Sequence, residues 1–192
     1  MSAEDRHKWE QRYAAAQGQV AHPSQVLARL QPLFPPARGA DPQRRATALD
    51  VAGGAGRHAL WLAELGYDVT LVDIAAAGLQ IASDRAEQAG LPLATIRLDL
   101  DDAPLPTGPW DLVLVTMFVD RTLFARAAAE LAPHGVLVYL QPTHTNLTRH
   151  EKPPRDFLLQ DGEMPGLVAA AGLEIVHYEE GWLEDGRHDA CV

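Results

Sequence analysis

Hydrophobic positions along the chain fall into two patterns that alternate with each other. Short, nearly continuous apolar runs predict buried strands covered on both faces. These runs lie at 48–51, 67–73, 93–98, 110–115 and 136–140. Between them lie stretches with apolar residues three or four apart, which predict helices at 55–65, 75–88 and 120–132. Strands and helices in this order indicate an α/β fold with a doubly wound, mostly parallel sheet and right-handed crossovers.

The residues before the first predicted strand form a different segment. Residues 4–16 and 24–33 predict two helices, and the prolines from 32 to 42 predict a stiff linker. We therefore expect a single domain over the whole chain. Residues 1–45 would be its N-terminal helices and linker, and residues 46–192 its core.

The alternation ends after the fifth predicted strand. Residues 141–161 are polar, contain three prolines and are too long for a simple turn, so we expect a substrate loop there. Residues 162–171 predict a helix, and 173–178 predict a sixth strand. Residues 187–192 can pair with that strand as an antiparallel hairpin.

A glycine-rich turn joins the first predicted strand to the helix that follows. Gly53, Gly54 and Gly56 lack the Cβ atoms that would keep a ligand away from the backbone. The second strand ends in Asp73, whose carboxylate can accept two hydrogen bonds from a ribose diol. The first strand carries Asp50 next to this turn. The pattern predicts a nucleotide-type site at the carboxyl end of the sheet.

Two cofactor chemistries use such a unit. The run from Gly54 to Ala59 fits the dinucleotide fingerprint, which leaves an NAD(P)-dependent oxidoreductase as an alternative. Asp50 would repel a pyrophosphate but attract the ammonium group of S-adenosylmethionine. The position of Asp50 therefore favours a methyl donor over a dinucleotide.

The segment Leu-Asp-Val-Ala-Gly-Gly-Ala-Gly-Arg-His-Ala-Leu-Trp-Leu-Ala, residues 49–63, resembles the first motif of class I S-adenosylmethionine-dependent methyltransferases. In the family pattern, acid-x-Gly-x-Gly-x-Gly, Asp50 is the acid and Ala52 replaces the first glycine. We expect its methyl group to hold the loop slightly further from the ligand. The resemblance implies a Rossmann-like seven-stranded sheet of order 3-2-1-4-5-7-6. Its antiparallel seventh strand is absent from dinucleotide dehydrogenases.

The resemblance also implies which residues bind S-adenosylmethionine. The expected set is Tyr13, Asp50, Ala52, Gly53, Gly54, Gly56, Asp73, Ile74, Asp99, Leu100, Thr116 and Phe118. Tyr13 belongs to a Trp-x-x-Arg-Tyr segment that covers the cofactor mouth in the family. Some of these residues have simpler explanations. Asp73 could cap a helix, Asp99 could be a loop acid, and Thr116 and Phe118 could be core residues.

The second half resembles tellurite-resistance-type and related small-molecule methyltransferases in residues 157–163 and 174–180. Methyl transfer from a sulfonium is an in-line displacement, so the protein mainly aligns the reactants. We expect a small acceptor that is anionic, a thiol or a metalloid. The expected catalytic residues are Arg155, Arg187 and His188, with surface charge balance as their alternative role. His144 and His150 are further candidate bases.

Composition and charge bear on the expected partners, location and metal content of the protein. The 192-residue chain has a net charge of −10, which disfavours nucleic acid as a partner. It has one cysteine, no long apolar run and no signal sequence, so we expect a cytoplasmic protein without a membrane span. The histidines lack metalloenzyme spacing, so we expect no metal. A non-catalytic S-adenosylmethionine-binding domain is a further alternative, and the sequence indicates no oligomeric state.

Overall fold

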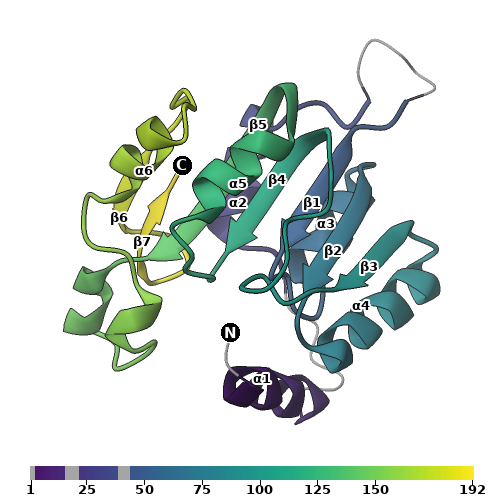
Figure 1. Ribbon diagram of the computed structural model, residues 1–192, viewed down its shortest axis with the longest axis horizontal. Helices are drawn as coiled ribbons and strands as arrows, with labels where there is room; N and C mark the ends of the chain where they lie inside the picture. The colour runs from purple at the N-terminus through teal and green to yellow at the C-terminus, as the bar shows by residue number, and fades with distance from the viewer. Residues whose placement is uncertain (1–2, 16–21, 39–43) are drawn as a thin grey trace.

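Residues 3–15, 22–38 and 44–192 are described by a computed structural model, in which seven strands form one sheet (Figure 1). The order is β3-β2-β1-β4-β5-β7-β6. The strands are β1 (Thr47–Val51), β2 (Asp68–Asp73), β3 (Leu93–Arg97), β4 (Trp110–Thr116), β5 (Leu131–Pro142), β6 (Glu179–Trp182) and β7 (His188–Cys191). Strands β1 to β5 are parallel, and β7 is antiparallel to both β5 and β6. The predicted order and the antiparallel seventh strand are confirmed.

Helices cover both faces of the sheet. They are α1 (Ala3–Ala15), α2 (Gln25–Leu30), α3 (Arg57–Glu64), α4 (Ala76–Ala89), α5 (Leu123–Glu130) and α6 (Met164–Ala170), with 3-10 turns at Gln31–Leu33, His144–Thr148 and Arg155–Phe157. Helices α2, α3 and α4 share one apolar core with the sheet, and α5 and α6 share the other. Each buried leucine or phenylalanine in these cores contributes roughly 1.5–3 kcal/mol. No described helix is long and apolar enough to cross a membrane.

Helix α1 lies apart from these two layers, at the bottom of the view in Figure 1. Trp9 and Tyr13 are one helical turn apart, and their rings stack with centroids 5.9 Å apart. The carboxylate of Glu10 accepts a hydrogen bond from the N–H of Ala77 in α4, at 3.3 Å. Both aromatic rings line a cavity at the carboxyl end of the sheet, which is described below.

The predicted sixth strand at 173–178 is wrong. This segment has no regular structure, Val176 is 76% exposed, and β6 begins only at Glu179. The hairpin turn sets the register, because Trp182 pairs with His188 and the pairing ends where Glu179 faces Cys191. Residues 173–178 therefore lie outside the ladder despite their apolar composition.

The boundary between α5 and β5 also differs from the prediction. Helix α5 begins at Leu123 rather than near residue 120 and ends at Glu130. Strand β5 begins at Leu131, before the Pro-His-Gly segment at 133–135 that lies between the predicted helix and the predicted strand at 136–140. The segment forms an irregularity within β5. The register of the pairing between β4 and β5 shifts between Trp110 and Leu112, and His134 has a φ of 65°.

Candidate functional site

The glycine turn follows β1 directly, and two of its glycines are sterically required. Gly54 has a φ of 59°, and a Cβ there would overlap the hydroxyl of Tyr13. Gly56 has a φ of 77°, and a Cβ there would lie 2.7 Å from the Cβ of Ala82 in α4. The glycines thus permit close contact of the turn with α1 on one side and with α4 on the other.

Ala52 lies in the left-handed region of backbone conformation, with a φ of 55°. An L-residue in this region is less stable by roughly 1–2 kcal/mol, which explains why glycine is usual at this position of the motif. The departure from the family pattern therefore affects backbone strain in addition to the space near the ligand. Ala52 itself lines the cavity.

Asp50 is fully buried beneath the turn, and neither of its carboxylate oxygens has a hydrogen-bond partner among the described residues. A Cβ on Gly53 would overlap this carboxylate, so the turn lies directly against it. The N–H of Ala59 is close enough to favour the charged form but lies outside hydrogen-bonding geometry. Burial raises the pKa of Asp50 to about 7. A cationic group of a ligand would supply the missing partner.

Asp73, in contrast, is satisfied by backbone donors. Its Oδ2 accepts a hydrogen bond from the N–H of Gly54 at 2.8 Å, and its Oδ1 accepts one from the N–H of Ala75 at 2.9 Å. Burial raises its pKa, and these N–H groups oppose the shift. The carboxylate thus links the glycine turn to the start of α4. A carboxylate has about four acceptor positions, so two remain for a ligand.

These groups surround a cavity of about 330 Å³, a volume within the range of small-molecule sites. Its lining residues are Trp9, Tyr13, Ala52, Asp73, Ile74, Asp101, Thr116, Met117, Phe118, Val119 and Phe157. Six of the twelve expected cofactor residues line it, and Asp50, Gly53 and Gly54 lie in or directly beneath the adjoining turn. Phe157 comes from the long segment at 141–161, which thus reaches the cavity. Our prediction did not include Met117, whose φ of 56° marks the bend after β4.

Two expected adenine contacts lie elsewhere. The carboxylate of Asp99 accepts hydrogen bonds from Arg6 in α1, at 3.1 Å, and from the N–H of Asp101, at 3.2 Å. Leu100 is buried in the core shared with α5 and α6. Neither residue lines the cavity, whereas Asp101 does. Sequence position along the strand identified this edge of the sheet, but it could not determine which side chains of the loop turn inward.

His58 is a site residue that the sequence analysis missed. Its Nε2 accepts a hydrogen bond from the N–H of Ser24, so its Nδ1 carries the proton and donates to the hydroxyl of Thr116, at 3.2 Å. Burial lowers its pKa to about 3, so the ring is neutral. His58 therefore fixes Thr116 at the cavity wall. No spacing rule marks such a contact between distant segments.

The expected acceptor residues are dispersed. Arg187 pairs with Asp185 at 3.3 Å and with the buried Asp189 at 3.2 Å. Arg155 is exposed on its 3-10 turn. The Nδ1 of His188 lies 2.7 Å from the hydroxyl of Thr143. None of these three lines the cavity, and their role toward an acceptor stays a prediction.

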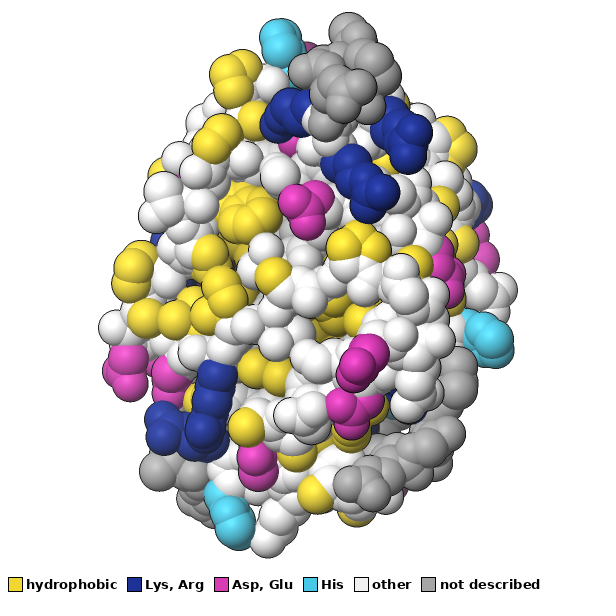
Figure 2. Space-filling model, turned by 90° about the vertical axis from the view of Figure 1, so that its right-hand side faces the viewer, with side chains coloured by type: hydrophobic (Ala, Val, Ile, Leu, Met, Phe, Trp, Pro, Cys, Tyr) yellow, Lys and Arg dark blue, Asp and Glu magenta, His cyan; other side chains and the backbone are white. Residues whose placement is uncertain are grey.

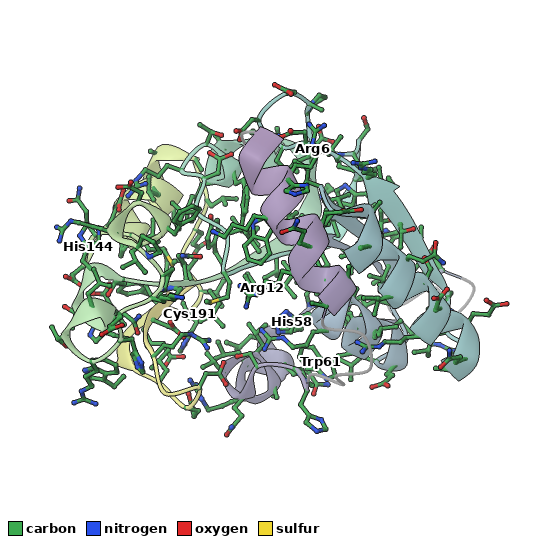
Figure 3. The ribbon with its side chains drawn as sticks, turned by 90° about the horizontal axis from the view of Figure 1, so that it is seen from below. Arg6, Arg12, His58, Trp61, His144 and Cys191 are labelled. Carbon is green, nitrogen blue, oxygen red and sulfur yellow. The ribbon has the colours of Figure 1, made fainter. Side chains whose placement is uncertain are left out.

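The other two candidate bases are similarly distant from the cavity. His144 lies at the left edge of the molecule in Figure 3, whereas α1 crosses the middle of the view. The Nε2 of His150 lies 3.0 Å from the carbonyl oxygen of Gly186 in the hairpin turn. Arg149 stacks over the ring of Trp182, 3.9 Å from its centroid. The long segment is therefore fastened to the β6–β7 hairpin rather than open to a ligand at these positions.

A second cavity of about 350 Å³ lies on the apolar side of β5, between the 3-10 turn after α2 and the irregular segment at 173–177. Its lining is mainly aliphatic, and none of the expected cofactor residues reaches it. Its size does not make it the candidate cofactor site, because the glycine turn and the buried acids are at the other cavity.

Comparison with known proteins agrees with this geometry. Residues 48–135 match the methyltransferase domain family. Among solved structures, TehB from Haemophilus influenzae is 18% identical with a TM-score of 0.68, and the match covers 95% of this chain and 65% of TehB. A TehB-like S-adenosylmethionine-dependent methyltransferase from Corynebacterium glutamicum is also 18% identical, with a TM-score of 0.63 and coverage of 99% and 97%. A search of curated protein sequences gave no match.

A third solved structure is a geranyl diphosphate C-methyltransferase from Streptomyces coelicolor, in complex with Mg²⁺, geranyl diphosphate and S-adenosylhomocysteine. It is 18% identical with a TM-score of 0.63, and the match covers 81% of this chain and 61% of that protein. At these identities the likenesses establish the fold, and this chain spans less than two thirds of the length of TehB. Residues 48–135 thus match a methyltransferase domain, and the strand order 3-2-1-4-5-7-6 is the fold that the chain shares with these S-adenosylmethionine-dependent methyltransferases.

Proposed function

We propose that the 330 Å³ cavity and the adjoining glycine turn hold S-adenosylmethionine, and that the acceptor is a small molecule that is anionic, a thiol or a metalloid. The observation that carries the cofactor assignment is the buried carboxylate of Asp50, which has no hydrogen-bond partner in the part of the chain that the structure describes. The ammonium group of the methionine end would neutralise it, directly or through a water. A pyrophosphate at the same place would meet a negative charge.

The remaining contacts follow from the position of each side chain. Asp73 would accept hydrogen bonds from the ribose hydroxyls with the acceptor positions that its backbone partners leave open. Ile74 and Phe118 supply apolar walls for the adenine. Asp101 faces the cavity where Asp99 was expected, and we assign it the polar contact at the adenine end.

When bound, the cofactor supplies an electrophilic methyl group on a sulfonium. The chain itself contributes position and an environment that excludes water. Trp9, Phe118 and Phe157 place apolar surface around the cavity, and the hydrogen bond from His58 holds Thr116 in its wall. An acceptor that already carries an anion or a soft lone pair needs no protein base, which fits a cavity whose described lining contains no histidine.

The expected acceptor residues lie outside the lining of the cavity. We keep Arg187 as a ligand for an anionic acceptor, because arginine binds carboxylates and oxyanions with two parallel hydrogen bonds. Arg155 and His188 stay predictions, as does the role of residues 141–161 as a substrate loop. That segment places Phe157 at the cavity, so acceptor contacts from it are sterically reasonable.

Calorimetry separates the two cofactor chemistries. We expect the protein to bind S-adenosylhomocysteine and to give no heat with NAD. The acceptor is then sought among thiols, metalloid oxyanions and small carboxylic acids, with formation of S-adenosylhomocysteine as the readout. Binding of NAD without any response to S-adenosylhomocysteine would contradict the proposal. If no compound of these three classes supports turnover, the acceptor class is wrong while the cofactor assignment stands.

A further inference from the structure

The hydroxyl group of Thr116 has a fixed direction of hydrogen bonding. Thr116 is the last residue of β4 and lines the cavity, and its Oγ1 lies 3.2 Å from the Nδ1 of His58. The Nε2 of His58 accepts the N–H of Ser24, at 3.3 Å, and a backbone N–H can only donate. Because the buried ring is neutral, Nδ1 carries its one proton and donates it to Thr116.

This direction leaves the proton of the Thr116 hydroxyl for another partner. A threonine hydroxyl has one donor and two acceptor lone pairs, and His58 uses one of the lone pairs. Among the described residues, no acceptor lies within hydrogen-bonding distance of this hydroxyl. Thr116 is only 6% exposed, so a missing acceptor is costly there. A ligand in the cavity that Thr116 lines would supply the acceptor.

The orientation of His58 is fixed by contacts outside the cavity. His58 and Ser24 are both buried, and Figure 3 shows His58 between α1 and α2. The hydroxyl of Ser24 and the N–H of Gln25 both donate to the carboxylate of Asp185, in the β6–β7 hairpin turn. The hairpin thus holds Ser24, Ser24 holds the ring of His58, and the ring holds the Thr116 hydroxyl.

Thr116 and Asp50 project from the same face of the sheet. Asp50 on β1 is in register with Leu114 on β4, two residues before Thr116. Leu114 and Ala48 belong to the core shared with α2, α3 and α4, and alternate residues of a strand face the same side. Thr116 is therefore displaced from Asp50 by about 5 Å across the sheet and about 7 Å along it. Asp73 lies on β2, on the other side of β1.

This placement selects one part of the cofactor. The proposed function assigns the ammonium group to Asp50 and the ribose to Asp73, so the adenosine part extends from β1 toward β2 and away from β4. The carboxylate of the methionine end is bonded to the same carbon atom as the ammonium group. The described lining of the cavity contains no lysine, arginine or histidine that could neutralise it, so neutral donors have to bind it.

We infer that the hydroxyl of Thr116 donates a hydrogen bond to the carboxylate of the cofactor's methionine end, and that His58 is the positioning residue that keeps this hydroxyl a donor. The inference rests on the proposed function. It gives Thr116 a specific partner within the cofactor site, and it assigns a role to His58, which the sequence analysis did not include.

The test compares two ligands by calorimetry, S-adenosylhomocysteine and its decarboxylated analogue, which keeps the ammonium group. We expect Thr116→Val to weaken S-adenosylhomocysteine binding at least ten-fold and to change binding of the analogue less than two-fold, because a hydrogen bond to a charged group is lost only with the first ligand. Thr116→Ser keeps the hydroxyl and should keep most of the preference. The matched control is Thr47→Val, at the amino end of β1, where the hydroxyl donates to the carbonyl of Pro109 at 3.2 Å. The control should bind both ligands like the unaltered protein.

Two variants of His58 test its positioning role. His58→Phe should lower the preference for S-adenosylhomocysteine over the analogue at least three-fold. His58→Gln should restore it, because one amide can accept from Ser24 and donate to Thr116. Equal weakening of both ligands in these variants would mean a purely structural role for His58 and would overturn that part of the inference. Urea unfolding identifies a variant that does not fold, and in that case the Thr116 variants decide.

Three results with Thr116→Val would overturn the inference. They are an unchanged preference between the two ligands, an equal loss of both, and unchanged affinities accompanied by a higher KM for the methyl acceptor. The last result would assign the hydroxyl to the acceptor. Failure of the unaltered protein to bind S-adenosylhomocysteine would instead contradict the proposed function, and it would be seen before any variant is compared.

Discussion

Replacing Asp50 by asparagine should stabilise the protein while weakening cofactor binding. The substitution keeps the size of the side chain and removes its charge. Asp50 is fully buried and neither oxygen has a hydrogen-bond partner, so its charged form is poorly stabilised in the ligand-free protein. Opposite effects on stability and on binding are expected when a group is retained for a ligand rather than for the fold.

The magnitude follows from the pKa of about 7 in the folded protein. In the unfolded chain the pKa is about 4, and the difference corresponds to roughly 4 kcal/mol. Because the folded-state pKa is raised, ionisation of Asp50 lowers the free energy of unfolding of the wild-type protein. The protein has its full stability below pH 4, and it loses this amount as the pH rises to 7. A buried asparagine without partners forfeits about 1–3 kcal/mol at any pH. The variant should therefore be close to wild type at pH 5 and about 1–3 kcal/mol more stable at pH 8.

Urea unfolding at pH 5 and pH 8, followed by the fluorescence of the four tryptophans, measures this difference. Calorimetry at pH 8 should show S-adenosylhomocysteine binding weakened by about ten-fold or more in the same variant. A variant that is less stable than wild type at pH 8 would refute the reasoning, because it would mean that the Asp50 carboxylate is well solvated or hydrogen-bonded in solution. Unchanged binding would separate Asp50 from the cofactor.

Two further predictions concern the same edge of the sheet. Asp73→Ala should weaken S-adenosylhomocysteine binding ten-fold or more and lower the free energy of unfolding by about 1–3 kcal/mol, because two backbone N–H groups lose their acceptor. Calorimetry and urea unfolding check this, and an unchanged dissociation constant would leave Asp73 a purely structural role. Ala52→Gly should relieve the left-handed backbone and raise the free energy of unfolding by up to about 1 kcal/mol, net of the added entropy of the unfolded chain. A loss of stability in urea unfolding would contradict that account.

The features that could be predicted from the sequence are those fixed by local chemistry. A glycine turn between a buried strand and a helix has few alternative conformations, and the acid at the end of the next strand must lie beside it in a parallel sheet. Asp50, Gly54 and Asp73 therefore lie together as expected. The antiparallel last strand was predictable from the family resemblance and from the hairpin pattern at 187–192.

The features that could not be predicted depend on contacts between distant segments. Residues 173–178 have strand-like composition, but the register of the β6–β7 hairpin excludes them from the ladder. Asp99 was expected at the adenine, yet it pairs with Arg6 from a helix more than ninety positions earlier in the chain. His58 contacts Thr116 across the sheet edge for the same reason. No periodicity within either segment encodes such pairs.

The charged residues at the carboxyl end of the sheet agree with the proposed binding of a cationic cofactor there. Figure 2 shows the face near α4 and β3, where basic side chains lie in separate groups with acids between them rather than in one basic field. At the glycine turn, Asp50 and Asp73 lie beside the cavity that we assign to the cationic cofactor, whereas Arg187 in the hairpin is paired with Asp185 and Asp189. A cofactor with a sulfonium and an ammonium group would meet the opposite charge at this turn. On the proposed function, Asp50 has no partner among the described residues because a protein partner would occupy the place of the cofactor's ammonium group.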